Sequence, residues 1–216
     1  MKACIFDLDG TLTDTLESLV YSVNTSLNEM GLERISDDQC RTFVGNGARY
    51  LMECALKAAG DEGASRIEEG MKVYGRVFDA NCTYRVTPYE GIVSMLEMLK
   101  EKGMKLAVLS NKPHKQTVDV VQTIFGKEMF AYIQGQCESI KRKPEADGVF
   151  HILKELGISK EECMYVGDSE VDVQTGKNAG VTNISVTWGF RSKEFLECAG
   201  AENIIEKPEE LLKFIS

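Results

Sequence analysis

Short apolar runs alternate with helical repeats over the second half of the chain. From residue 104 onward, three apolar stretches have the length and composition of buried strands, namely Met104–Ser110, Cys163–Gly167 and Thr182–Thr187. Apolar residues between them recur on one helical face: Val118, Val121, Ile124 and Phe125, then Val149, Ile152, Leu153 and Leu156. This alternation predicts a parallel sheet wound by right-handed crossovers, with the apolar run Ala3–Phe6 as its central strand.

Residues 16 to about 85 show helical spacing and no strand pattern. The apolar positions are Leu16, Leu19, Val20, Val23 and Leu27 in a first stripe and Leu51, Leu56, Met71, Tyr74 and Phe78 in later ones. We therefore predict an α/β fold in which a Rossmann-like parallel sheet core, residues 1–14 and 86–216, carries an inserted all-helical cap domain, residues 15–85. Linkers at Asp14-Thr15 and Thr87-Pro88 would join the two and make a hinge plausible.

The charge of the chain argues against polyanionic partners. Among 216 residues, 43% are hydrophobic, as in ordinary globular proteins, and the net charge is −9. Such a charge repels nucleic acid and anionic membranes. The densest basic run, Lys141-Arg142-Lys143, is too short for a polybasic segment. We expect no nucleic acid or membrane partner.

Cysteine usage and hydropathy indicate a compartment. The seven cysteines are scattered without a CxxC pair, and their odd number argues against a closed disulfide framework. No basic and apolar leader precedes the first strand, and no apolar run approaches the roughly 18 residues of a membrane span. We expect a cytoplasmic protein.

Two carboxylates, Asp7 and Asp9, follow the strand Ala3–Phe6 directly. Adjacent like charges at the end of a buried strand cost several kcal/mol or more unless a cation accompanies them. The simpler alternative is that both are solvated turn acids. An EF-hand calcium loop does not fit, because Gly10 stands at the fourth position from Asp7 and that loop needs glycine at the sixth.

Further polar clusters follow the other predicted strands. Ser110-Asn111 comes after one strand, Asp168 and Asp172 come after another, and Lys143 precedes Pro144 at the start of a helix. Each has an ordinary alternative as a helix cap, a turn acid or a surface lysine. Because ligands bind outside the carboxyl ends of parallel strands, however, the topology predicts that these clusters meet at one site.

Together these clusters resemble the haloacid dehalogenase (HAD) superfamily of phosphohydrolases. The run DLDGT at Asp7–Thr11 is similar to its first motif, Ser110 to its second, Lys143 to its third and GDSEVD at Gly167–Asp172 to its fourth. The helical insert resembles the cap of the subgroup that contains phosphoglycolate phosphatases and β-phosphoglucomutases. The usual second proline after Lys143 is missing, which leaves Lys141 and Arg142 as alternatives for the lysine.

The resemblance implies catalytic roles. Asp7 would be the nucleophile that takes the phosphoryl group, and Asp9 would protonate the leaving alkoxide and later deprotonate water. Ser110 and Lys143 would bind the phosphate, and Lys143 would also offset charge between Asp7 and Asp168.

The resemblance also implies Mg²⁺, because a phosphate dianion cannot approach an acidic site unaided. We expect its ligands to be the Asp7 carboxylate, the Asp9 backbone carbonyl and Asp168. Asp172, on the same face as Asp168 if the helix has begun there, would hold a water bound to the ion.

Substrate recognition is expected from Thr11 and Asn111 and from the cap loop. Gly45, Asn46 and Gly47 resemble the specificity loop of phosphoglycolate phosphatases, with Arg49 available for a carboxylate or second phosphate of the substrate. The alternative is that the two glycines only separate two helices. Trp188 and Phe190, after the last predicted strand, are expected to pack in the core, with lining of the site as the alternative.

The sequence thus predicts a magnesium-dependent phosphomonoesterase of a small phosphorylated metabolite, with 2-phosphoglycolate as the first candidate. It would act as a monomer or weak homodimer. The alternatives are a β-phosphoglucomutase-like phosphomutase, a pyrophosphatase, a nucleotidase and a non-catalytic phosphate-sensing protein, since a fold does not fix a substrate.

Overall fold

A computed structural model of the chain describes residues 1–215 and divides them into two compact units. Residues 1–14 and 87–215 form the first, here called the sheet unit, and residues 15–86 form the second, the helical unit. The junctions expected from the sequence, at 14/15 and 85/86, fall within one residue of these boundaries. We describe each unit by itself.

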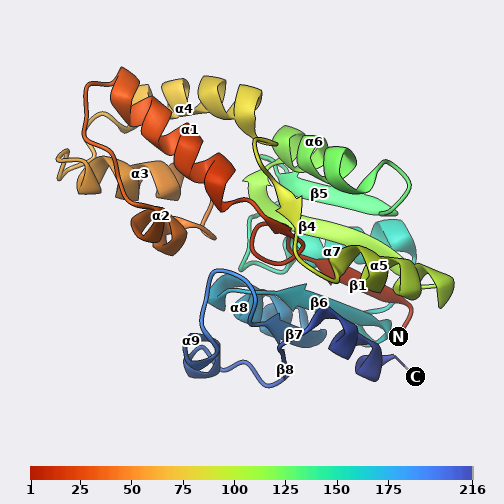
Figure 1. The fold of residues 1–216 in the computed structure, drawn as a ribbon. Helices are drawn as coiled ribbons and strands as arrows, with labels where there is room; N and C mark the ends of the chain where they lie inside the picture. The colour runs from red at the N-terminus through yellow and green to blue at the C-terminus, as the bar shows by residue number, and fades with distance from the viewer. Residues whose placement is uncertain (216) are drawn as a thin grey trace. The chain divides into compact units, whose positions relative to one another are not determined.

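A parallel sheet of six strands forms the centre of the sheet unit (Figure 1). In spatial order the strands are β5 (Tyr132–Gln136), β4 (Lys105–Pro113), β1 (Ala3–Phe6), β6 (Cys163–Gly167), β7 (Thr182–Val186) and β8 (Ile204–Ile205). All neighbouring pairs are parallel, and β1 lies inside the sheet between β4 and β6. The predicted α/β class and the central position of Ala3–Phe6 are confirmed.

Two strands of this sheet were not predicted, and two differ in extent from the prediction, β7 by ending one residue earlier at Val186 and β4 by more. β5 and β8 are the edge strands of the sheet, and neither carries a long apolar run that would predict a buried strand. β4 begins one residue later than predicted and continues to Pro113, three residues beyond Ser110. This extension carries Asn111 and Lys112 past the end of the neighbouring β1.

Helices cover both faces of the sheet. They are α5 (Ile92–Glu101), α6 (His114–Phe125), α7 (Asp147–Leu156) and α8 (Glu170–Ala179). Val149 and Ile152 of α7 pack on the face that presents Ile5, Ala107 and Tyr165. Right-handed crossovers place α8 with α7 on this face and α5 with α6 on the other (Figure 1).

Shorter elements complete the sheet unit. They are the antiparallel pair β2 (Thr13–Asp14) and β3 (Thr87–Pro88), the helix α9 (Lys193–Cys198) and the 3₁₀ helices η1 (Lys160–Glu162) and η2 (Pro208–Phe214). The β2–β3 pair ties the turn after β1 to the segment that returns from residue 86.

The helical unit has its own core. It consists of α1 (Leu16–Glu29), α2 (Asp37–Phe43), α3 (Ala48–Ala58) and α4 (Ile67–Asn81). In the stripe of α1, Val23 and Leu27 are fully buried and Val20 is partly buried. Leu56 and the stacked pair Tyr74 and Phe78, whose ring centroids are 5.1 Å apart, are buried as well. Within residues 15–86 the structure has no strand, as the spacing predicts.

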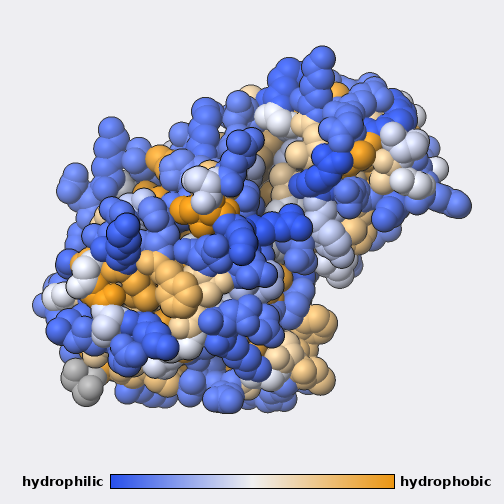
Figure 2. Space-filling view, turned by 180° about the vertical axis from the view of Figure 1, so that it is seen from behind, coloured by the Kyte–Doolittle hydropathy of each residue, from blue (hydrophilic) through white to orange (hydrophobic). Residues whose placement is uncertain are grey.

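The exposed surface is mixed in character. On the face drawn in Figure 2, hydrophilic residues cover most of the area and hydrophobic ones show as smaller patches between them. This is ordinary for a folded domain, because polar atoms cannot cover a whole surface. Among residues 1–215, none of the helices has the length and apolar character needed to cross a membrane.

Candidate active site

Asp7 lies at the point where β1 leaves the sheet. Its backbone N–H donates to the Val166 carbonyl of β6 at 2.9 Å, so the residue is still held by the neighbouring strand. Only 7% of the residue is exposed. The parallel register brings the ends of β1, β4 and β6 to the same edge, which places Asp7 among the residues that follow the other two strands.

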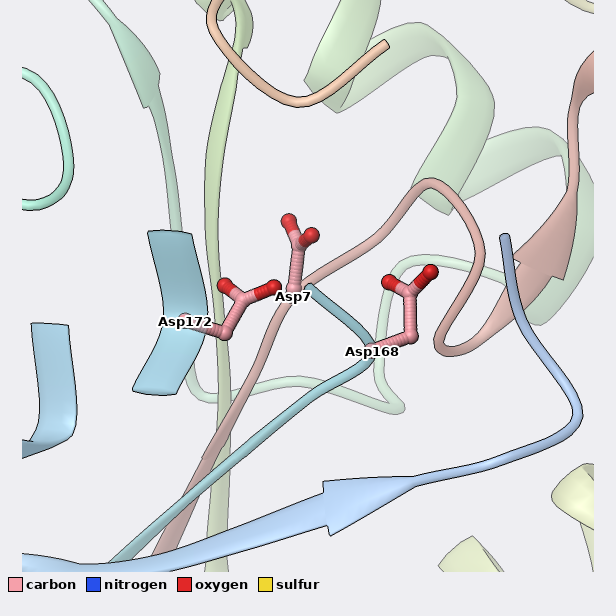
Figure 3. A group of neighbouring side chains, drawn as sticks. All are labelled: Asp7, Asp168 and Asp172. Carbon is pink, nitrogen blue, oxygen red and sulfur yellow. The ribbon is translucent and has the colours of Figure 1, made fainter. Parts of the chain in front are cut away.

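Three buried carboxylates meet there (Figure 3). Asp7, Asp168 and Asp172 each have a carboxylate oxygen within 4.8 Å of the others, and their side chains point into one common space. Asp168 follows β6 directly, and Asp172 stands in the first turn of α8. Since α8 begins at Glu170, Asp168 lies before the helix, so the condition under which the two acids would share a helical face is not met. The two acids meet because the turn between them is tight.

A lysine ammonium joins two of these acids. Lys143 Nζ lies 2.8 Å from Asp7 Oδ1 and 2.7 Å from Asp172 Oδ1, with its side chain 3% exposed. The ammonium was expected between Asp7 and Asp168, and the structure places it between Asp7 and Asp172 instead. Within the basic run 141–143, Lys143 contacts these acids, whereas Lys141 is exposed and faces Asp147.

Asn111 holds the backbone of Lys143. The side-chain carbonyl of Asn111 accepts from the Lys143 N–H at 2.9 Å, and its amide donates to the Lys143 carbonyl at 3.1 Å. This pair of bonds connects the end of β4 to the loop that carries the lysine. Asn111 therefore positions Lys143, and the role toward the substrate expected for Asn111 stays a prediction.

Asp172 is saturated with hydrogen bonds. Its Oδ1 accepts from the Tyr165 hydroxyl at 2.8 Å as well as from Lys143, and its Oδ2 accepts from the Ser169 N–H and hydroxyl at 3.1 and 2.5 Å. Ser169 also caps α8 through the Asp172 N–H, forming a capping box. The Asp172 carboxylate is consequently fixed in position next to Asp7.

Asp168 is held by the turn after β1 and by the loop after β7. Its Oδ1 accepts from the Thr11 hydroxyl at 3.0 Å, and its Oδ2 accepts from the Phe190 N–H at 2.8 Å. A Cβ added at Gly10 or at Gly189 would lie 2.3 or 2.4 Å from Asp168 Oδ2, so both positions need glycine. The Thr11 hydroxyl thus supports this carboxylate, and the substrate contact expected for Thr11 stays a prediction.

The loop after β7 frames the site. The Trp188 indole N–H donates to the Thr11 carbonyl at 2.9 Å, and Trp188 and Phe190 are half-buried. The expectation that these two aromatic residues pack in the core is therefore wrong, and their alternative role beside the site fits better.

A second lysine holds Asp9. Lys112 Nζ lies 2.6 Å from Asp9 Oδ1, and the exposed fractions of the two side chains are 2% and 12%. Ser110 stands two residues earlier on β4 and is buried, with its hydroxyl accepting from the Lys112 N–H at 3.2 Å. Asp9 and Ser110, the two residues of this group that the sequence predicts at strand ends, thus lie at the same edge of the sheet as Asp7.

Burial and crowding shift the titration of these groups. Burial raises the pKa of Asp7 well above its usual range; the charge of Lys143 opposes the rise, and those of Asp172 and Asp168 add to it. Burial and the charge of Asp172 raise the pKa of Asp168 to about 7. For Lys143, burial lowers the pKa, but the charges of Asp172 and Asp7 raise it more, so the net shift is upward. Lys143 is an ammonium at neutral pH.

The site carries an excess of negative charge. The charged groups gathered there are the carboxylates of Asp7, Asp9, Asp168 and Asp172 and the ammonium groups of Lys112 and Lys143. Four negative and two positive charges leave a net charge of minus two when all are ionised. A bound divalent cation would neutralise it, and carboxylate oxygens are the ligands that hard divalent cations prefer.

The remaining predicted site residues belong to the helical unit. Gly45 and Gly47 both have positive φ, 122° and 88°, and Gly47 stands immediately before α3. Arg49, in the first turn of α3, is half-exposed and pairs with Glu68 at 2.6 Å and Glu53 at 3.5 Å. Asn46, between the glycines, is partly buried.

Three supporting groups escaped the sequence interpretation. Lys112, Tyr165 and the Phe190 N–H each donate to a predicted acid. Tyr165 lies inside an apolar strand and Phe190 contributes only backbone, so neither had a signal of its own. Lys112 did have one, because it stands two residues after Ser110 on a strand and alternate residues share a face.

The comparisons with known proteins agree with this geometry. The family described as haloacid dehalogenase-like hydrolase matches residues 4–186. A phosphoglycolate phosphatase of Aquifex aeolicus is 31% identical over 215 residues, covering 100% of this chain and 97% of that protein. A phosphoglycolate phosphatase of Rhodobacter capsulatus is 32% identical over 199 residues, an alignment that covers 88% of this chain and 85% of that protein.

A solved structure shows the same architecture along the whole chain. A protein of Lactobacillus delbrueckii subsp. bulgaricus, provisionally named a phosphoglycolate phosphatase, superposes with a TM-score of 0.91 at 29% identity over 99% of this chain and 98% of that one. The resemblance inferred from the sequence motifs is thereby confirmed. The chain belongs to the haloacid dehalogenase-like hydrolase family, among the phosphatases of that family.

Proposed function

We propose that this phosphatase is a magnesium-dependent phosphomonoesterase in which Asp7 takes the phosphoryl group of a small phosphorylated metabolite. The observation that carries the proposal is the position of Asp7: a buried carboxylate at the strand end, bonded to Lys143 and within 4.8 Å of two further acids. Such a group needs no general base to act as a nucleophile once its charge is balanced.

The donor set fits Mg²⁺. Asp7, Asp168 and the backbone carbonyl of Asp9 would hold the ion. Both oxygens of Asp172 already accept hydrogen bonds, which suits a residue that holds the ion through a water. When bound, Mg²⁺ supplies positive charge that offsets the charge of the phosphate and of the four carboxylates.

Two displacements at phosphorus complete the reaction. In the first, an oxygen of Asp7 bonds to phosphorus, the ester P–O bond breaks, and Asp9 gives a proton to the departing alkoxide. In the second, water attacks the aspartyl phosphate, Asp9 takes the proton, and the Asp7–phosphorus bond breaks to release inorganic phosphate. Ser110 and Lys143 would hold the phosphoryl oxygens in both steps.

The names of the relatives make 2-phosphoglycolate the first substrate candidate. We propose that the helical unit acts as a cap and selects the substrate through the loop Gly45 to Gly47 and through Arg49. A guanidinium suits a carboxylate because its fork of N–H donors matches two oxygens. A phosphomutase uses the same aspartyl phosphate, so a mutase remains the alternative outcome of the test, with pyrophosphate and nucleotides as alternative substrates.

A panel of phosphorylated metabolites tests the proposal. We expect Mg²⁺-dependent release of inorganic phosphate that chelation abolishes and metal restores. Sugar phosphates are followed for isomerisation as well as for phosphate release, which separates a mutase from a phosphatase. Absence of phosphate release from every compound, with metal present, would contradict the proposal.

Asp7→Asn should lower turnover about a thousand-fold or more, because the amide cannot attack phosphorus. The matched control is Asp147→Asn, which removes an exposed carboxylate of the same unit and should leave turnover unchanged. Thermal unfolding of both variants shows whether the fold persists. Retained activity in Asp7→Asn would exclude Asp7 as the nucleophile.

Arg49→Ala tests the role of the helical unit separately. If Arg49 binds the substrate carboxylate, kcat/KM for 2-phosphoglycolate should fall about ten-fold more than kcat/KM for p-nitrophenyl phosphate, which has no carboxylate. Glu53→Ala, which removes one of the acids that Arg49 pairs with, is the control for loss of the surface ion pair. Equal losses on the two substrates would argue against this role.

A further inference from the structure

Lys112 reaches the turn after β1 because β4 is longer than its neighbour. β1 ends at Phe6, opposite Val108, whereas β4 continues to Pro113. This overhang places Lys112 beside the turn, where its ammonium lies 2.6 Å from Asp9 Oδ1. An ammonium with 2% of its side chain exposed is costly unless it is paired, so the contact with Asp9 is built into the fold.

The backbone of Lys112 is fixed on several sides. Its N–H donates to the Ser110 hydroxyl at 3.2 Å, and its carbonyl accepts from the Thr117 hydroxyl of α6 at 3.1 Å. Gly135 of β5 lies so near that an added Cβ would be 2.8 Å from the same carbonyl. Because the backbone of Lys112 is held in place, its ammonium can fix the position of the Asp9 carboxylate.

We propose that Lys112 is the positioning residue of Asp9 and determines which oxygen of that carboxylate transfers the proton. The inference rests on the proposed function, in which Asp9 protonates the departing alkoxide. Because the ammonium holds Oδ1, Oδ2 is the oxygen that is directed toward the ester oxygen. The proton therefore passes from Oδ2 to the ester oxygen as the P–O bond breaks.

The proposal makes a prediction that depends on the leaving group. A poor leaving group such as an alkoxide needs the proton from Asp9, whereas p-nitrophenolate departs without it. A lysine that only bound the phosphoryl oxygens would assist both kinds of ester equally. The parameter kcat/KM reports the steps up to the first irreversible one, so it contains the bond cleavage in which the proton moves.

The test compares Lys112→Met with Lys115→Met, an exposed lysine three residues further on. For Lys112→Met we expect kcat/KM to fall about 100-fold on an alkyl phosphate and by less than about five-fold on p-nitrophenyl phosphate, within the range of general acid catalysis. Lys115→Met should match the unmodified protein on both. Lys112→Arg, which keeps a cation, should recover part of the loss.

A double-mutant cycle with Asp9→Asn completes the test. If Lys112 acts through Asp9, Lys112→Met should cause little further loss once Asp9 is Asn. Thermal unfolding checks the fold, and Lys112→Gln replaces Lys112→Met in every comparison if the latter does not fold. Equal losses on both esters, additive losses in the cycle, or no loss at all would overturn the proposal. Absence of phosphate release by the unmodified protein would instead overturn the proposed function.

Discussion

At Lys143, one ammonium is shared by two buried carboxylates. Its contacts with Asp7 and Asp172 are 2.8 and 2.7 Å long, and the Asn111 amide fixes the backbone from which it extends. A bound phosphate would meet the same ammonium, so this residue serves both the resting site and the proposed reaction. Removing one partner of a buried ion pair is expensive because the remaining charges lose their compensation.

Lys143→Met should therefore destabilise the protein as well as inactivate it. We expect the free energy of unfolding to fall by about 3 kcal/mol or more at neutral pH without added metal. Lys141→Met is the control, because Lys141 is 71% exposed and two residues away. Urea denaturation of both variants measures the difference. Similar stability of the two variants would show that the Lys143 pair contributes nothing to folding.

At the scale of elements, the turn between β1 and β2 is shaped around Asp168. Gly10 has a φ of 89°, and an added Cβ would lie 2.3 Å from Asp168 Oδ2. The Thr11 hydroxyl of the same turn donates to the other oxygen of Asp168. The glycine of the first motif is thus required for two separable reasons, a backbone conformation and a close contact.

Gly10→Ala and Gly103→Ala separate these reasons. Gly103 also has a positive φ, 79°, but an added Cβ there meets no atom within 4 Å. Both variants should lose roughly 1 kcal/mol or more of stability from backbone strain. Only Gly10→Ala should also weaken Mg²⁺ binding. We expect a loss of about ten-fold or more, the size typical when a group that orients a metal ligand is disturbed. Titration calorimetry measures that affinity. Unchanged affinity in Gly10→Ala would show that Asp168 tolerates displacement.

The elements differ in how well their sequence predicted them. Ala3–Phe6 and Cys163–Gly167 are buried along their whole length, so an apolar run was sufficient to predict both strands. β5 is an edge strand with the polar sequence Tyr-Ile-Gln-Gly-Gln, and its pairing with β4 comes from tertiary context. The motif acids could be assigned because topology brings strand ends together.

Their supporting bonds could not be assigned from the sequence. The contact between Lys112 and Asp9 joins residues 103 apart, and that between Thr11 and Asp168 joins residues 157 apart. The contact between Thr11 and Asp168 depends on the pairing of β1 with β6, and that between Lys112 and Asp9 depends on the length by which β4 extends beyond β1. No local pattern in the sequence encodes either. For the same reason, the sequence interpretation wrongly expects Lys143 between Asp7 and Asp168, whereas it lies between Asp7 and Asp172.

At the scale of the whole molecule, the acidic site couples stability to pH and to metal. Asp7 and Asp168 have raised pKa values in the folded chain, that of Asp168 being about 7 against 3.8 for an unperturbed aspartate. Between these two values the folded protein binds more protons than the unfolded chain. The free energy of unfolding contributed by Asp168 is therefore fully present below about pH 4 and is lost as the pH rises through about 7.

Metal-free protein should accordingly show a steeper loss of stability from pH 5 to pH 7.5 than the variant Asp168→Asn, which lacks the titrating group. Added Mg²⁺ should raise the unfolding temperature of the unmodified protein more at pH 7.5 than at pH 5, because the ion binds the ionised carboxylates. Calorimetric unfolding at the two pH values measures both effects. Parallel pH profiles of the two proteins would contradict the assigned titration.

The central claim is that Asp7 carries the phosphoryl group, and chemical trapping tests it most directly. The protein is mixed with Mg²⁺ and a substrate that it hydrolyses, quenched within one turnover, and reduced with borohydride, which converts an aspartyl phosphate to homoserine. Mass spectrometry of the peptides should find homoserine at position 7 in the unmodified protein and none in Asp7→Asn. Phosphate release accompanied by an unmodified Asp7, or by homoserine at another position, would contradict the account.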